Sequence, residues 1–518
     1  MVFGILKTKD YCTFELCGLT FEGAQKANRG LPGDVMSDDF KILNRANHSG
    51  LVGVLELTKS LYGFTTRNLP IYLFVPWNES YPPFYVSSSY RNTTKNVLAI
   101  VDFESWNSDK NCPRGFCREV IGPCGDLESE EAALLVHVKP KKWKRTLPIL
   151  DSPLPPVQGG YKLEGQTFHI DPPGCRDIDD AVTLWQTGDD SIEVRIHIAD
   201  VASLLSTNDW LWESALQSQT IYKEGAVVAG LFPSSVEQSV SLLPGKPRMT
   251  LTLGVTIKDG NVRDIRWFQQ EIDVKESYTY DTILLSKHYV LLREVTSCMA
   301  GKDVVDPHDW VAELMLFYNK EAAKILHASG VGILRRHSAP DMKYLKTLEE
   351  LGKVPTYLAY SSGEYCSPTD DTIHWGLGTN VYCHATSPIR RWVDCINQGH
   401  LMNILFSHCV RIPVANVDNL NTMAKTIKKY ERDITFLRVL IGPNSVKEVS
   451  GIVVDSSVNL RIWVEAWKQI VIVKGVYEFL PGTAISLKIF FDAGKRNWKR
   501  RMVFALESTK IEVSQPPN

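Results

Sequence analysis

A proline-rich segment limits how this chain can fold. Five prolines lie between residues 140 and 156, and Gly159 and Gly160 follow them. Proline lacks the backbone N–H that helices and central strands need, so neither element runs through this segment. We therefore predict a linker at residues 139–164, which divides the chain into an amino-terminal part and a longer carboxy-terminal part.

The composition is that of a globular protein with several domains. Its 518 residues are 44% hydrophobic and 22% charged, and 57 basic residues nearly balance 59 acidic ones. We find no apolar run long enough to span a membrane, and charge occurs too early in the chain for a secretion signal. Eleven scattered cysteines indicate reduced thiols. We expect an intracellular protein, cytoplasmic rather than nuclear, with no membrane contact and no secretion.

Both ends of the chain have the pattern of small β-barrels. Short β-branched and aromatic runs alternate with Gly, Pro, Asn and Ser at residues 13–16, 51–57, 71–75 and 97–103. The alternation returns after Gly442, at residues 451–454, 460–465, 470–473, 485–490 and 502–506. Such spacing is typical of barrels. We predict barrels at residues 1–50, 51–138 and 445–510.

The central residues 165–440 have a mixed pattern. Residues 192–199 alternate as a strand, whereas the apolar residues of 310–327 have helical spacing. Further helices are predicted at 390–405, entered through Ser387 and Pro388, and at 416–440. The predicted fold class is therefore α+β and multidomain, with a mixed central body between β-barrels.

The densest chemical signal is a run of aspartates. Asp171, Asp177, Asp179 and Asp180 occur within ten residues, and a Pro-Pro-Gly turn separates the first from the others. The turn allows the carboxylates to converge, which is costly unless a cation neutralises them. Hard oxygen ligands favour Mg²⁺ or Mn²⁺, and a phosphate commonly completes such a site. The alternative is an acidic surface loop or a calcium site.

A second candidate site lies at residues 386–391. Ser387 and Pro388 can begin a helix whose free N–H groups face an anion. Arg390 and Arg391 add phosphate donors in the same turn. The alternative is a capped helix that carries two surface arginines.

The cysteines predict no further site. Cys112, Cys117 and Cys124 lack the paired C-x-x-C spacing of a zinc centre, so no zinc is expected. Cys175 lies between the aspartates, but no His or Asn partner supports it as a nucleophile.

The two candidate sites belong to a longer series of motifs. In chain order these are DPPGCRDIDDA at 171–181, HIADV at 197–201, ILRRHSAP at 333–340 and TSPIRR at 386–391. The series resembles the ribonuclease II/ribonuclease R superfamily of 3′→5′ exoribonucleases, the RNB-domain proteins. Residues 114–116 and 125–128 resemble the second cold-shock barrel of the eukaryotic exosome-associated branch.

This resemblance implies a domain order and a metal site. It implies amino-terminal OB/cold-shock β-barrels, an RNB catalytic domain at 165–440 and a carboxy-terminal S1-type OB barrel. Asp171, Asp177 and Asp180 would hold Mg²⁺ or Mn²⁺. Asp179 would belong to the same metal site and position the attacking water.

The resemblance also implies RNA contacts. Arg390 would contact the scissile or terminal phosphate, with Ser387 and Arg391 beside it in the RNA-binding segment. Tyr222 lies where the family places an aromatic clamp against the RNA 3′ end. The alternative for such a tyrosine is a buried ring whose hydroxyl finds a hydrogen-bond partner.

The implied activity is that of a processive, metal-dependent 3′→5′ exoribonuclease that releases nucleoside 5′-monophosphates from single-stranded RNA. Tyr280 matches an active-site tyrosine, and Glu313 matches a glutamate on a helix that lines the site. The alternative is an inactive RNB-fold protein that binds RNA or scaffolds a decay complex. Retention of all four aspartates and Arg390 favours the enzyme.

The sequence departs from the exosome-associated branch in two places. That branch usually carries an amino-terminal PIN endonuclease domain, for which this chain has no room, so endonucleolytic activity is not expected. Trp392-Val393-Asp394 stands where Tyr-Ala-Asp is usual after the arginines. Single-stranded RNA is the expected partner, with an exosome-like or RNA-decay complex as a further one.

Overall fold

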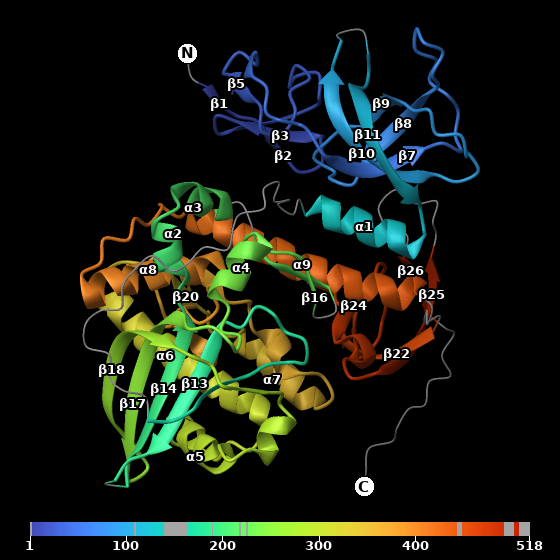
Figure 1. Ribbon diagram of the computed structural model, residues 1–518. Helices are drawn as coiled ribbons and strands as arrows, with labels where there is room; N and C mark the ends of the chain where they lie inside the picture. The colour runs from blue at the N-terminus through green and yellow to red at the C-terminus, as the bar shows by residue number, and fades with distance from the viewer. Residues whose placement is uncertain are drawn as a thin grey trace, which may run out of the picture. The chain divides into compact units, whose positions relative to one another are not determined.

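The computed structural model describes residues 3–107, 110–138, 164–188, 190–216, 219–223, 226–442, 448–491 and 502–506. The chain divides into two compact units (Figure 1). The first comprises Met1–Lys139, Leu348–Pro355 and Lys428–Asn518, and the second comprises Pro140–Thr347 and Thr356–Ile427. All but the last residue of the linker predicted at 139–164 lie outside the described residues, so the domain boundary there stays a prediction.

The first unit begins with two small antiparallel sheets. They share a core of Leu6, Phe14, Leu16, Ala27 and Met36. Where the sequence predicted one barrel, at residues 1–50, the structure thus has two three-stranded sheets around a common core. The strands are β1 (Phe3–Ile5), β5 (Val35–Ser37) and β6 (Ile42–Asn44) in one sheet, and β2 (Lys7–Thr8), β3 (Thr13–Leu16) and β4 (Leu19–Glu22) in the other.

A closed barrel follows, as predicted from the second group of β-runs. Its strands are β7 (Leu51–Glu56), β8 (Ile71–Pro76), β9 (Phe84–Ser87), β10 (Val97–Ser105) and β11 (Arg114–Pro123). Gly53 is required where β7 meets β8, because a Cβ there would lie 2.3 Å from the Val75 carbonyl oxygen. Helix α1 (Leu127–His137) follows, and the Asp126 side chain caps it by accepting a hydrogen bond from Ser129 N at 3.0 Å.

A carboxy-terminal antiparallel sheet also belongs to the first unit. Its order is β24-β23-β22-β25-β26, and every strand lies where the sequence predicted one. Over the described residues β24 and β26 do not pair, so closure into an S1-type barrel is not observed there. The elements are β22 (Glu448–Asp455), β23 (Leu460–Val464), η4 (Glu465–Trp467), β24 (Gln469–Val473), β25 (Ala484–Phe491) and β26 (Met502–Leu506).

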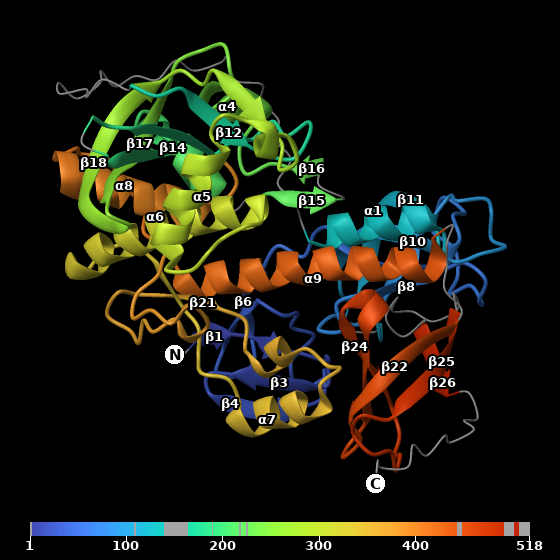
Figure 2. The same cartoon turned by 90° about the horizontal axis from the view of Figure 1, so that it is seen from below.

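The second unit is built on a sheet in the order β18-β17-β14-β13-β12-β19. Figure 1 shows strands β18, β17, β14 and β13 of this sheet, and Figure 2 also labels β12. Its neighbouring strands run antiparallel, except β12 and β19, which run parallel. The strands are β12 (Thr167–Ile170), β13 (Asp180–Gln186), β14 (Ile192–Ala199), β17 (Arg248–Lys258), β18 (Asn261–Ile272) and β19 (Glu276–Tyr278).

The apolar face of this sheet packs against two helices. Strand β14 alternates, so that Val194 and Ile196 share a core with Leu292 of α5 and Trp310 of α6. Figure 1 shows both helices beside the sheet. They are α5 (Tyr289–Ala300) and α6 (Pro307–Ala328), the second confirming the helix predicted at 310–327.

The opposite face of the sheet carries a chain of hydrogen bonds. The His197 ring lies between the hydroxyls of Thr183 and Thr252 on the neighbouring strands, at 2.9 and 2.8 Å. Thr183 in turn contacts the Thr167 hydroxyl of β12 at 2.7 Å. Burial lowers the pKa of His197 to about 3, so the ring is neutral. A change of strand register would leave these buried polar groups without hydrogen-bond partners, which is costly. The series of hydrogen bonds therefore stabilises the observed register.

A second core joins the remaining helices of this unit. Gln398 of α8 accepts hydrogen bonds from the N–H groups of Val201 and Ala202, both at 2.9 Å, and so caps α2. The helices in this core are α2 (Val201–Ser206), α3 (Asp209–Ala215), α4 (Ser234–Val240) and α8 (Trp392–Phe406).

Within the described residues, no helix combines the length and apolar character needed to cross a bilayer.

The prediction that a helix begins at Arg390 is wrong by two residues. Ser387 to Arg390 form a turn, in which the Arg391 N–H donates to the Ser387 carbonyl at 2.9 Å, and α8 starts at Trp392. The helix predicted at 416–440 is confirmed as α9 (Val417–Ile441). The remaining elements are β15 (Ile221–Lys223), β16 (Ala226–Ala229), η1 (Thr282–Leu285), β20 (Leu334–Arg336), α7 (Met342–Leu351), η2 (Thr356–Ala359), β21 (Glu364–Cys366) and η3 (Trp375–Leu377).

We expect Trp310→Ala to destabilise the second unit by about 3–5 kcal/mol, because the fully buried ring would leave a cavity. The indole N–H would also no longer donate to the Val304 carbonyl, at 2.7 Å. Urea unfolding followed by circular dichroism measures the change. Val290→Ala on α5, where the side chain is exposed, is the control and should change stability by less than about 0.5 kcal/mol. Equal midpoints for the two variants would contradict the assigned core.

Candidate functional site

The predicted aspartates lie in the segment between β12 and β13, here called the aspartate segment (residues 171–180). Asp171 directly follows β12, and Asp180 is the first residue of β13. The Asp171 N–H donates to the Tyr278 carbonyl at 3.0 Å, and the Ala199 N–H donates to the Asp179 carbonyl at 2.9 Å. The sheet therefore fixes both ends of the segment.

Ser241 fixes the middle of the aspartate segment. Its hydroxyl donates to the Arg176 carbonyl at 2.7 Å and accepts from the Ile178 N–H at 3.0 Å. The backbone of Asp177 is therefore held on both sides.

Asp179 joins the aspartate segment to residues 386–391, here called the arginine segment. Its Oδ1 accepts from the Ile389 N–H at 2.8 Å, and its Oδ2 accepts from Arg390 Nε at 3.1 Å. The Asp179 side chain is only 4% exposed. Burial raises the pKa of Asp179 to about 7, although Arg390 and the Ile389 N–H act in the opposite direction. Asp179, which the family resemblance assigns to the metal site and its attacking water, thus binds the arginine segment through both of its carboxylate oxygens.

Asp394 holds the arginine segment from the side of α8. Its Oδ1 accepts from the Ser387 N–H at 2.8 Å and from Arg391 Nη2 at 2.9 Å. Arg390 Nη2 donates to the Ser387 hydroxyl at 3.0 Å. The sequence predicted free N–H groups for an anion in this turn, but the N–H groups of Ser387 and Ile389 donate to carboxylates of the protein itself.

Asn319 of α6 fixes the residues that lead into the arginine segment. Its side-chain carbonyl accepts from the Ala385 N–H at 2.8 Å, and its amide nitrogen lies 3.3 Å from the Thr386 hydroxyl. Asn319 is buried, so these contacts are shielded from water.

Two further aspartates have partners of their own. Asp171 Oδ2 lies 2.8 Å from His169 Nδ1, and the other ring nitrogen of His169 lies 2.8 Å from the Ser277 hydroxyl. The Tyr222 hydroxyl donates to Asp177 Oδ2 at 2.6 Å, and the Cys175 thiol lies 3.4 Å from Asp177 Oδ1. The alternative to an aromatic clamp was a buried tyrosine whose hydroxyl finds a hydrogen-bond partner. The Tyr222 hydroxyl has such a partner in Asp177.

Asp180 differs from the other three, because its side chain has no hydrogen bond or ion pair within the described part of the chain. Burial raises the pKa of Asp180 well above its ordinary value, and the charges of Asp171 and Asp179 raise it further. A cation would relieve this repulsion. Mg²⁺ is commonly held by one or two carboxylates, with phosphate and water as its other ligands. Asp171 and Asp180 therefore fit a hard divalent cation.

The metal site of four aspartates stays a prediction. Across the described ranges, no group of three or more His, Cys, Asp or Glu residues is arranged to hold a metal ion. The contacts give the reason, since Asp177 binds Tyr222 and Asp179 binds the arginine segment.

Tyr280 lies near the same carboxylates. Burial raises the pKa of Tyr280, and the charges of Asp171 and Asp180 raise it further. The ring stacks on His308 of α6 with a centroid distance of 3.8 Å. Glu313 lies further along α6 and makes no hydrogen bond or ion pair with another described residue. The structure thus brings Tyr280 to the aspartates and leaves Glu313 without a contact to them.

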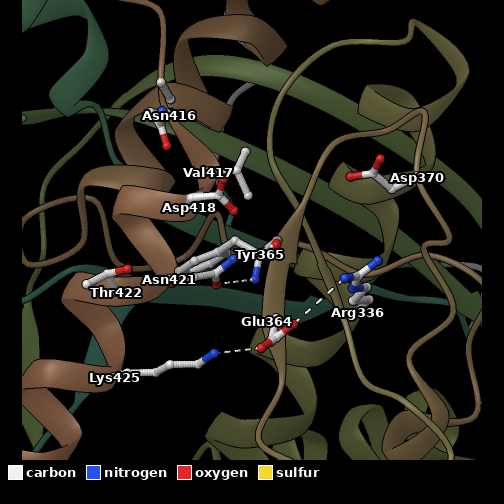
Figure 3. A pocket seen from close by; sticks show the side chains of 11 residues that line it. Arg336, Glu364, Tyr365, Asp370, Asn416, Val417, Asp418, Asn421, Thr422 and Lys425 are labelled. Atoms are coloured by element: carbon white, nitrogen blue, oxygen red, sulfur yellow. Dashed lines mark hydrogen bonds and ion pairs between the residues drawn. The ribbon is translucent and has the colours of Figure 1, made fainter. Parts of the chain in front are cut away.

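A polar pocket of about 510 Å³ lies elsewhere in the second unit (Figure 3). Glu364 in its wall pairs with Lys425 at 2.8 Å and with Arg336 at 3.8 Å. Asn421 bonds the backbone N–H and carbonyl of Tyr365, at 2.8 and 2.9 Å. None of the predicted site residues lines this pocket, so it is distinct from the aspartate segment.

Sequence reasoning missed the residues that position the predicted ones. Two of them had a local signal: His169 stands two residues before Asp171, and Asp394 lies one helical turn after Arg391. Ser241 and Asn319 lie in distant parts of the chain, so nothing near the aspartates or the arginines in the sequence indicates their contacts.

Comparison with known families confirms two of the predicted domain types, the RNB domain and the second cold-shock barrel. The RNB domain family model matches residues 163–287 and 287–407, and the Dis3-like cold-shock domain 2 (CSD2) model matches residues 71–139. The exosome complex exonuclease RRP44 of Mus musculus is 23% identical over 452 residues, which cover 69% of this chain and 47% of that protein. The chain therefore spans about half the length of the sequence relatives it matches.

Solved structures share the architecture. RNase R of Mycoplasma genitalium in complex with ribose methylated single-stranded RNA has a TM-score of 0.74 at 15% identity, covering 98% of this chain and 100% of that chain. Yeast Ssd1, a pseudonuclease, has a TM-score of 0.61 at 13% identity, covering 94% of this chain and 80% of that chain. Identities this low establish the fold alone.

The fold and the paired aspartate and arginine segments define a multidomain α+β protein with an RNase R-like architecture, as the sequence predicted. Residues 163–407 match the RNB domain, which agrees with the resemblance to the RNB-domain proteins.

We expect Mg²⁺ to raise the stability of the protein by about 1.4 kcal/mol at a concentration tenfold above its dissociation constant. The Asp171→Asn/Asp180→Asn double variant should lose this response, because it lacks the charges that attract the ion. Thermal unfolding with and without Mg²⁺ measures the effect without any assay of activity. Asp370→Asn in the separate pocket is the matched control and should respond like the unchanged protein. A double variant that still responds in full would remove these two residues from the metal site.

Proposed function

We propose that this protein is a metal-dependent 3′→5′ exoribonuclease that hydrolyses single-stranded RNA processively to nucleoside 5′-monophosphates. The observation that carries the proposal is the contact of Asp179 with Ile389 and Arg390. It brings an arginine to the aspartate segment, where Asp171 and Asp180 fit a cation. The matched RRP44 of mouse is an exonuclease, and the matched RNase R is bound to single-stranded RNA, which supports this substrate class.

Asp171 and Asp180 are the residues that would hold Mg²⁺ or Mn²⁺. The bound ion would supply activation of a water molecule and neutralisation of charge on the phosphate. His169 keeps Asp171 oriented through the contact at 2.8 Å. The positions of both carboxylates follow from the ends of β12 and β13.

Arg390 would bind the phosphate. Its Nε is held by Asp179 and its Nη2 by the Ser387 hydroxyl, which leaves Nη1 for a phosphate oxygen. The side chain is 42% exposed, so RNA can reach it. A fixed guanidinium stabilises negative charge that develops in the transition state. Arg391, paired with Asp394, would support the turn and not contact RNA directly.

Aromatic side chains would hold the RNA end. Tyr280 lies near Asp171 and Asp180, and Tyr222 contacts Asp177, so either ring can stack on a base beside the reacting phosphate. We keep Glu313 as a proposed lining residue from the family resemblance. An exosome-like complex is the proposed protein partner, because the matched mouse protein is an exosome exonuclease.

An inactive RNA-binding protein is the second candidate. The observation that favours it is the fold shared with yeast Ssd1, a pseudonuclease. The retained Asp171, Asp177, Asp179, Asp180 and Arg390 favour the enzyme.

The deciding experiment is incubation of 5′-labelled single-stranded RNA with the purified protein and Mg²⁺. We expect a short 5′-labelled end product that accumulates with few intermediates, release of nucleoside 5′-monophosphates, and no reaction in EDTA. RNA that is bound but stays intact would establish the inactive candidate instead.

We expect Arg390→Lys to lower kcat by about 10²-fold, because lysine keeps the charge beside Asp179 but loses the planar set of donors. Arg263→Ala is the matched control, since Arg263 pairs with Asp259 on the surface at 3.5 Å. The control should retain the original kcat. An Arg390→Lys rate equal to that of the control would refute the assigned role of Arg390.

A further inference from the structure

A buried histidine of strand β12 lies beside the candidate metal site. Phe168 and Ile170 of this strand belong to the core of the second unit, so His169 between them lies on the opposite face of the sheet. Asp171, two residues further on, follows on the same face, which brings its carboxylate next to the ring. His169 is only 7% exposed, so its ring nitrogens depend on partners within the protein.

Two hydrogen bonds fix the direction of the His169 ring. Its Nε2 lies 2.8 Å from the hydroxyl of Ser277, the residue of β19 that pairs with His169 in the sheet. Its Nδ1 lies 2.8 Å from Asp171 Oδ2. An ionised carboxylate only accepts hydrogen bonds, so Nδ1 carries the hydrogen that is donated to Asp171. Two neighbouring strands therefore determine where this N–H points.

The bond from His169 makes the two carboxylate oxygens of Asp171 different. Oδ2 accepts from the ring, whereas Oδ1 has no hydrogen bond or ion pair with any residue that the structure describes. The bond also opposes rotation of the carboxylate, because a rotated Oδ2 would leave the buried Nδ1–H without an acceptor. Asp171 is therefore prepared to offer a cation one oxygen instead of two.

Cations differ in how they use a carboxylate. Ca²⁺ is large, takes a flexible arrangement of oxygen ligands and often binds both oxygens of one carboxylate. Mg²⁺ is smaller and needs nearly octahedral geometry. The two oxygens of one carboxylate lie too close together for neighbouring octahedral positions. A carboxylate limited to one oxygen therefore favours Mg²⁺.

We propose that His169 is a specificity-determining residue of the candidate metal site: its bond to Oδ2 restricts Asp171 to one oxygen ligand, so that the site selects Mg²⁺ over Ca²⁺. This inference rests on the proposed function for the presence of a cation at Asp171 and Asp180. It goes further, because it assigns the choice between ions to a residue outside the aspartate segment.

Two substitutions separate the two bonds of the ring. In His169→Asn the side-chain amide nitrogen takes the place of Nδ1, so the bond to Asp171 is kept. In His169→Gln the amide nitrogen takes the place of Nε2, so the contact with Ser277 is kept and the bond to Asp171 is lost. A residue that only supports the strand would respond to both substitutions alike.

The test measures the affinity of the full-length protein for Mg²⁺ and for Ca²⁺, without RNA. Thermal unfolding at rising ion concentrations, compared with the same variant in EDTA, gives both dissociation constants. We expect the ratio of the Ca²⁺ constant to the Mg²⁺ constant to fall by about tenfold in His169→Gln, as is typical for loss of a residue that orients a metal ligand. His169→Asn should keep the ratio within about twofold of the unchanged protein.

Two controls accompany these variants. His327→Gln, at the exposed carboxy end of α6, carries the same substitution and should behave like the unchanged protein. The Asp171→Asn/Asp180→Asn double variant measures ion binding elsewhere on the protein, which is subtracted.

An unchanged ratio in His169→Gln, an equal fall in His169→Asn, or no preference for Mg²⁺ in the unchanged protein would overturn the inference. If His169→Gln fails to fold, Ser277→Ala tests the same point, because it frees the ring to turn away from Oδ2 and should lower the ratio in the same direction. RNA hydrolysis is measured separately. Absence of hydrolysis by a protein that still selects Mg²⁺ would count against the exonuclease alone, and hydrolysis without that selection would count against the inference alone.

Discussion

One buried carboxylate holds the candidate site together. Asp179 accepts hydrogen bonds from Ile389 and Arg390, which lie 210 and 211 residues further along the chain. A buried carboxylate without partners is strongly destabilising, so the pair keeps both segments in place. The other positioning contacts serve this junction: the sheet fixes the aspartate segment, while Asp394 and Asn319 fix the arginine segment. With both segments held in place, Arg390 keeps Nη1 as a donor group for a ligand beside the aspartate segment.

Much of the fold could be predicted because the pattern of each element is local. Strand β14, helices α6 and α9 and the carboxy-terminal strands follow from alternation or helical spacing of apolar residues. The start of α8 was misplaced because Ser387 and Pro388 suit a helix start and a tight turn equally well. Closure of barrels was harder to predict, since pairing between first and last strands depends on residues far apart in sequence.

The sequence indicated which residues form the candidate site better than it indicated which contacts they make. The aspartate run and the paired arginines were visible as unusual local composition, and the structure brings Asp179 and Arg390 together. Their partners could not be read in the same way. Nothing near Asp177 in the sequence indicates that Tyr222 binds it, and nothing near Asp179 indicates that both of its oxygens are taken. The four aspartates have different partners because of how distant parts of the chain pack around them, and this packing is not visible in the local sequence.

The different contacts of the four aspartates matter because the fold alone does not decide activity. An RNase R structure bound to RNA and a pseudonuclease both share the architecture of this chain. Here Asp180 remains unpaired within the described residues, Asp171 lies near it, and Arg390 keeps a free group, and the proposed activity depends on these three side chains.

The most direct test of the account is a double-mutant cycle on Asp179 and Arg390, read as the single-turnover rate of shortening of 5′-labelled RNA. If the two residues form one junction, Asp179→Asn and Arg390→Gln each slow the step by about 10²- to 10³-fold, and the double variant is no slower than the slower single variant. Multiplied losses, in which the double variant is slower by the product of both factors, would contradict the account, because they would show that the two residues act independently.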